Sequence, residues 1–62
     1  MPTTTQDPDV RRLARDAVRQ AEGTSGWTAY EAAKGYARRT HPELFSCQHD
    51  AIIDAIKTRL EI

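Results

Sequence analysis

The sequence predicts a small all-α protein that folds as a three-helix bundle. Three stretches carry apolar residues at intervals of three and four, the period of one buried helical face. Each stretch is preceded by residues that commonly start helices. The chain has 62 residues, so it can bury one small core but not two. We expect helices at about residues 8–22, 28–40 and 47–60, within a single domain of residues 7–62.

The first predicted helix, residues 8–22, begins at Asp7 and Pro8. An aspartate at the N-cap accepts hydrogen bonds from free amide groups, and proline suits the first helical position because its missing N–H is not needed there. Gly23 ends this helix. Its predicted buried face consists of six apolar residues: Val10, Leu13, Ala14, Ala17, Val18 and Ala21.

The second predicted helix, residues 28–40, follows a short connection of glycine, serine and threonine. Thr28 and Glu31 have the spacing of a capping box, which places Trp27 where it packs onto the first turn and favours its burial. Pro42 ends the helix, because the residue before a proline is displaced from the helical region. Tyr30 lies at the edge of the predicted inward face, which consists of Ala29, Ala33, Tyr36 and Ala37.

The third predicted helix, residues 47–60, has Ser46 as its N-cap, and Leu44 and Phe45 fill the loop before it. We expect His49 to be half-buried, because it falls on the same helical face as the apolar residues. Those residues are Ile52, Ile53, Ile56 and Leu60. Residues 1–6 contain no apolar anchor after Met1, so we expect a disordered tail.

Composition excludes several classes of function. The formal net charge is zero, which argues against a general polyanion binder. No stretch approaches the roughly 18 consecutive apolar residues of a membrane span, and no secretory signal begins the chain, so we expect a cytoplasmic protein. The single cysteine cannot form an intramolecular disulfide.

The metal-capable and nucleophilic side chains do not form a recognisable motif. His41, Cys47 and His49 have a spacing that matches no structural zinc pattern. Cys47 and His49 are two residues apart on one predicted helix and point in different directions, which argues against a Cys–His dyad. We expect Cys47 to be a small packing residue rather than a thiol activated by the helix N-terminus. Asp50 and Asp54 lie on a face predicted to be exposed, with Lys57 near enough to pair with Asp54. We therefore predict no catalytic residue, no metal and no cofactor.

The exposed face of the first predicted helix carries four arginines: Arg11, Arg12, Arg15 and Arg19. Three of them recur at every fourth position and repel one another slightly. Because such a row does not stabilise a helix, it is a candidate surface for an anion, either a phosphate or an acidic protein, although a run of charge is more often an ordinary solvated face. The alternative is an ordinary solvated face, in which Asp9 and Asp16 reach Arg12 and partly balance it.

Further candidate residues lie on the second predicted helix. Its basic residues extend the arginine face if the two helices are antiparallel with their outer faces on one side: Lys34, Arg38 and Arg39. Gly35 lies among them at a cost of about 1 kcal/mol relative to alanine, which either close approach of a partner or simple tolerance explains. If Trp27 or Tyr30 is exposed, it suits a protein interface or base stacking on a single strand.

A helix-turn-helix is disfavoured, because the last predicted helix is acidic and Pro42 lies in the connection before it. We therefore predict a small non-enzymatic protein-binding module, a bacterial or phage regulator or inhibitor that occupies a partner's surface. A homodimer through apolar residues is the other association considered, and nucleic-acid binding is the alternative function. The candidate partner-binding residues are Arg11, Arg12, Arg15, Arg19, Tyr30, Lys34, Arg38 and Arg39.

Overall fold

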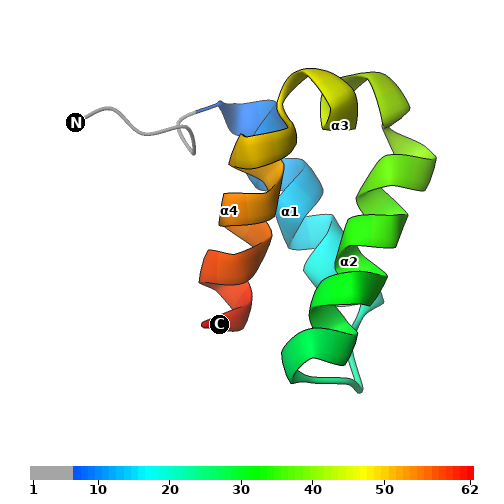
Figure 1. Ribbon diagram of the computed structural model, residues 1–62, viewed down its shortest axis with the longest axis vertical. Helices are drawn as coiled ribbons and strands as arrows, with labels where there is room; N and C mark the ends of the chain where they lie inside the picture. The colour runs from blue at the N-terminus through cyan, green and yellow to red at the C-terminus, as the bar shows by residue number, and fades with distance from the viewer. Residues whose placement is uncertain (1–6) are drawn as a thin grey trace.

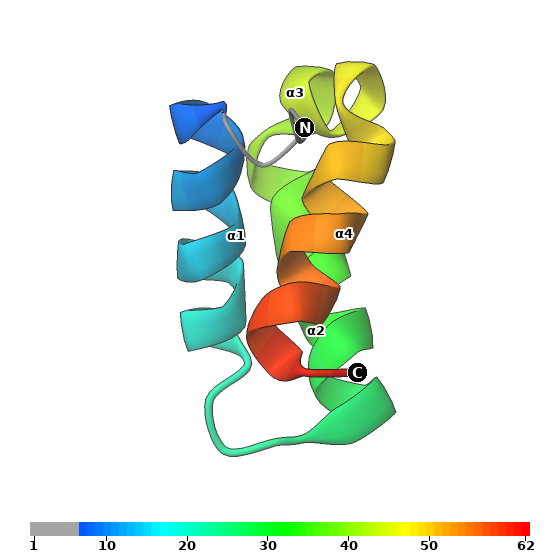
Figure 2. The ribbon, with the colours of Figure 1, turned by 90° about the vertical axis from the view of Figure 1, so that its left-hand side faces the viewer.

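The computed structural model describes residues 7–62 and consists of α-helices over that range, without a strand. The order is α1 (Pro8–Gln20), α2 (Gly26–Thr40), α3 (Pro42–Cys47) and α4 (His49–Leu60). Helices α1 and α4 run in the same direction, and α2 runs in the opposite direction. The short α3 crosses one end of the bundle (Figure 1, Figure 2). The predicted all-α bundle of three long helices is confirmed. The tail that we predict for residues 1–6 lies outside the described residues.

Helix α1 begins as the sequence predicts. Asp7 is the N-cap, and its Oδ1 accepts a hydrogen bond from the backbone N–H of Asp9 at 2.9 Å. The other carboxylate oxygen, Oδ2, accepts a hydrogen bond from Nε2 of Gln48 at 2.8 Å. Asp7 therefore starts α1 and also ties it to the junction between α3 and α4. The predicted buried face is confirmed, with Val18 partly buried and the others buried.

Helix α2 begins two residues before the predicted start. Ser25 is its N-cap, and Gly26 has a φ of +59°, a left-handed conformation that glycine adopts without strain. The predicted capping box of Thr28 and Glu31 is therefore wrong, because Thr28 already lies inside the first turn. Trp27 lies in this first turn and is exposed, although we predicted it to be buried, and Tyr30 is a buried member of the core.

The connection between α2 and the last long helix is helical rather than a loop. Helix α2 ends at Thr40, as expected from Pro42, but this proline then occupies the first turn of α3, where its missing N–H costs nothing. Ser46 is consequently inside α3 and does not cap the next helix, which begins at His49. The predicted plug of the connection is confirmed, with Phe45 buried and Leu44 packed against the core.

The core consists largely of small side chains. Half of its members are alanines, which lets α1 approach both α2 and α4 closely. The largest fully buried side chains are those of Ile52, Ile56 and Val10. The buried members are Val10, Leu13, Ala14, Ala17, Tyr30, Ala33, Ala37, Phe45, Ala51, Ile52, Ala55 and Ile56. With so few large residues, each one carries a substantial part of the folding free energy.

We predict that Ile52→Ala largely unfolds the protein. Truncation of a fully buried isoleucine lowers the free energy of unfolding by about 2–5 kcal/mol, comparable with the roughly 3–5 kcal/mol that a core of this size supplies. Thermal unfolding followed by far-ultraviolet circular dichroism measures the loss. The matched control is Ile62→Ala, because Ile62 is 52% exposed and its truncation leaves the midpoint nearly unchanged. Equal midpoints for both variants would contradict the described core.

A second prediction concerns the two roles of Asp7. Asp7→Ala removes the cap of α1 and the bond to Gln48, so it lowers the free energy of unfolding by about 1–2 kcal/mol. Gln48→Ala removes the tertiary bond alone and costs about half as much. Urea unfolding of both single variants and the double variant gives the coupling free energy between the residues. Strict additivity of the two effects would show that the Asp7–Gln48 bond contributes nothing.

Candidate functional site

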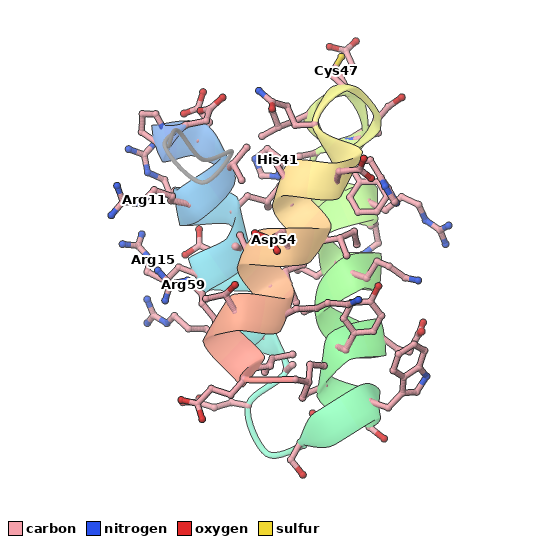
Figure 3. The ribbon with its side chains drawn as sticks, turned by 60° about the vertical axis from the view of Figure 1, so that its left-hand side comes forward. Arg11, Arg15, His41, Cys47, Asp54 and Arg59 are labelled. Carbon is pink, nitrogen blue, oxygen red and sulfur yellow. The ribbon has the colours of Figure 1, made fainter. Side chains whose placement is uncertain are left out.

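Three arginines from two helices lie together at one edge of the molecule. Arg11 and Arg15 of α1 extend beside Arg59 of α4 (Figure 3). The shallow hollow between these helices is lined by Pro8, Arg11, Arg12, Arg15 and Arg59, and a neighbouring one by Arg11, Ala55, Thr58 and Arg59. We call Arg11, Arg15 and Arg59 the arginine surface.

The parallel packing of α1 against α4 forms this surface. Arg11 follows the buried Val10 on α1, and Arg59 lies four residues after the buried Ala55 on α4. Both arginines therefore project from the margins of buried faces that meet each other. Arg59 was not among the predicted partner-binding residues. Its spacing from Ala55 would have placed it at the margin of its helix, but nothing in the sequence shows that this margin faces α1.

The arginine surface carries an excess of positive charge. Arg15 Nε lies 3.6 Å from Asp16 Oδ1 in an exposed ion pair. Within residues 7–62, no carboxylate lies within 4.0 Å of the guanidinium of Arg11 or of Arg59. Asp16 therefore balances one of the three positive charges of the arginine surface, and a local excess remains. The surface is suited to accept an anion of a partner.

The remaining arginines of α1 have other neighbours. Arg12 pairs with Asp9 at 3.7 Å, as predicted, whereas Asp16 reaches Arg15 instead of Arg12. Arg12 also lines a hollow between α1 and α3, together with Asp9, Leu13, Asp16, His41 and Leu44. Arg19 is exposed in the last turn of α1, where a cation interacts favourably with the helix dipole. The charge of Arg12 is therefore paired with Asp9, and that of Arg19 interacts with the dipole of α1.

Lys34 lies on a different side of the molecule. Its Nζ lies 5.1 Å from the centre of the Tyr30 ring, and Nζ of Lys57 on α4 lies 5.7 Å from the same ring. Lys34 therefore belongs to the side where α2 meets α4, whereas the arginine surface lies where α1 meets α4. No α2 residue lines the two hollows of the arginine surface. Arg38 and Arg39 are exposed in the last turn of α2.

Tyr30 is not the exposed aromatic that a partner-binding role requires. It is only 6% exposed and is a member of the core, whereas Trp27 is 66% exposed and contacts it with ring centres 4.8 Å apart. Of the two aromatics considered in the sequence, Trp27 is the one available to a partner. Tyr30 precedes the buried Ala37 by seven residues and shares its face, whereas Trp27 lies about 200° around the helix from the buried Ala29.

The histidines and the cysteine occupy the end of the bundle where α3 lies. Cys47 is exposed, and so is His49, whose side chain is 54% accessible and whose Nδ1 lies 3.3 Å from Asp50 Oδ1. The prediction of a packing cysteine is wrong, because Cys47 ends α3 with its side chain exposed. His49 is more exposed than the predicted half-buried residue, but its ring packs edge-on against the core residue Phe45, with centres 5.1 Å apart. His41 Nδ1 lies 2.9 Å from Thr40 Oγ1. Over residues 7–62, no three His, Cys, Asp or Glu side chains are grouped to hold a metal ion.

The comparisons with known proteins give no relative. No protein-family model, no curated protein and no solved structure matches this chain. Among the helices of residues 7–62, none combines the length and the apolar character needed to cross a membrane.

The sequence leaves two explanations for glycine at position 35 of α2: close approach of a partner, or simple tolerance of an imperfect helix. A Cβ added at Gly35 meets nothing within 4 Å, so packing within the chain does not demand glycine. We predict that Gly35→Ala raises the free energy of unfolding by about 0.8–1 kcal/mol, because it removes the conformational entropy cost of glycine in a helix. Urea unfolding measures the gain, with Ala32→Gly on the same helix as the reverse control. A stabilised variant that loses partner binding would assign Gly35 to close approach of that partner.

Proposed function

We propose that this protein is a small protein-binding module that engages an acidic surface of a partner protein through the arginine surface. One observation carries the proposal: guanidinium groups from two helices converge, and two of them have no carboxylate of residues 7–62 within 4.0 Å. Assembling like charges costs free energy, and a carboxylate pair from a partner offsets that cost. The planar guanidinium donates two parallel hydrogen bonds to one carboxylate, which adds specificity.

An acidic protein fits the surroundings of the arginine surface better than a nucleic acid does. Asp54 lies on the adjoining outer face of α4 (Figure 3). A long phosphate backbone that follows the arginines also approaches this carboxylate, whereas a protein partner places its acidic residues only where they are matched. The formal net charge of zero gives no general attraction to polyanions. Occupation of the partner's surface, as by a small cytoplasmic regulator or inhibitor, is the mode of action that we infer.

The test compares two double charge reversals that change the net charge equally. Arg11→Glu/Arg59→Glu alters the arginine surface, and Arg38→Glu/Arg39→Glu alters exposed arginines at the end of α2. Poly-L-glutamate serves as the acidic probe in a binding titration at several salt concentrations. We expect the first variant to weaken binding about tenfold or more, because each reversal replaces an attraction of order 1 kcal/mol by repulsion. The second variant should weaken it by no more than about twofold.

Other outcomes would contradict this proposal. Equal weakening by both variants would mean that the probe senses net charge and that the arginine surface is an ordinary solvated face. A parallel titration with mixed single- and double-stranded oligonucleotides tests the alternative function. Micromolar binding that falls steeply with salt and is lost in Arg11→Glu/Arg59→Glu would assign the arginine surface to phosphate contacts.

A further inference from the structure

Trp27 is the single tryptophan of the chain and its most exposed large apolar side chain among the described residues. It is nevertheless held in place. Its ring contacts the ring of Tyr30, with centres 4.8 Å apart and planes tilted by 39°. Because Tyr30 is buried in the core, the core itself sets the position of the exposed face of Trp27. An apolar ring that is both exposed and fixed is suited to bind a partner with little loss of side-chain entropy.

Two ammonium groups flank the same aromatic pair. Lys34 Nζ of α2 lies 5.1 Å from the centre of the Tyr30 ring, and Lys57 Nζ of α4 lies 5.7 Å from it. Both distances allow cation–π attraction, which favours these positions of the lysines. The side chains come from different helices, so the folded bundle is required to assemble the group.

The charges of these lysines are only partly balanced. Lys34 Nζ lies 3.7 Å from Glu31 Oε2, in an exposed pair that contributes little. The predicted pair of Lys57 with Asp54 is not formed, and within residues 7–62 no carboxylate lies within 4.0 Å of Lys57 Nζ. The surface therefore combines an exposed apolar ring with a net positive charge.

We propose that Trp27, Lys34 and Lys57, which the buried Tyr30 ring holds together and which we call the tryptophan–lysine surface, form a docking site for a peptide segment of a partner protein. The segment carries a large apolar side chain flanked by carboxylates. The apolar side chain covers Trp27, and the carboxylates bind the ammonium groups of Lys34 and Lys57. Charge complementarity selects this chemistry, because a basic segment is repelled and a neutral one leaves the ammonium group of Lys57 without a carboxylate. The site is separate from the arginine surface and does not depend on its function.

The experiment uses the emission of Trp27, which reports on this site alone because the chain has no other tryptophan. The probe is a synthetic peptide with two central leucines between pairs of glutamates, titrated into the full chain. We expect a saturable blue shift of the emission as the leucines exclude water from the indole ring. A peptide with serines in place of the leucines, and one with lysines in place of the glutamates, should each bind at least about tenfold more weakly.

Matched variants assign the effect to the proposed residues. Lys34→Ala/Lys57→Ala should weaken the leucine–glutamate peptide about tenfold. Arg38→Ala/Arg39→Ala removes the same charge elsewhere and should change the affinity by no more than about twofold. Arg11→Glu/Arg59→Glu should also leave it within about twofold, which separates this site from the arginine surface. Circular dichroism confirms that each variant is folded, and calorimetric titration of Trp27→Ala should show binding lost.

Three results would overturn the proposal. Equal affinity for the leucine and serine peptides would reduce the effect to charge attraction alone. Absence of a saturable shift with the leucine–glutamate peptide would show that the tryptophan–lysine surface does not bind such a segment. A homodimer in light scattering that Trp27→Ala dissociates would show that a second copy of the chain covers Trp27 instead.

Discussion

The close packing of three helices across small side chains is the constraint on which the rest of this structure depends. Six of the twelve core residues are alanines, and the large fully buried side chains are two isoleucines and a valine. A core of this kind gains free energy only when the helices approach closely, because alanine has little surface of its own to bury. The directions of α1, α2 and α4 and the positions of their exposed margins follow from that close approach.

Helix α4 determines where both candidate surfaces lie, since it contacts α1 on one side and α2 on the other. Arg59 lies at the margin next to α1 and joins Arg11, whereas Lys57 lies at the margin next to α2 and reaches the ring of Tyr30. Asp54 occupies the outer face between them (Figure 3). Asp54, Lys57 and Arg59 are separated by three and two residues, so one short helix carries a cation at each margin and a carboxylate on the face between them. A single helix can do this because each residue advances by about 100° around its axis.

The short helix α3 and the junction after it close one end of the bundle. Phe45 covers one end of the core, and Gln48 donates a hydrogen bond to Asp7, which begins α1. The first and last thirds of the described chain are thereby joined at the same end of the bundle. At the opposite end, the start of α2 exposes Trp27, although a chain of this size has little hydrophobic surface to spare.

The sequence by itself determined the three long helices and most of the core. The cap at Asp7, the apolar period of α1 and the break at Pro42 are local signals, and local backbone physics decides such features. It did not determine α3, because Pro42 both stops one helix and starts another and the two effects look alike in sequence.

Tertiary structure alone decided which residues meet at the surface. Trp27 joins the first turn of α2 and lies about 200° around the helix from the buried Ala29, so it is exposed, whereas Tyr30, seven residues before the buried Ala37, shares the buried face. The meeting of Arg59 with Arg11 depends on which margin of α4 contacts α1, and that choice is made by packing between residues more than forty positions apart. Periodicity shows that a helix has a buried face, but only the assembled core shows what lies beside it.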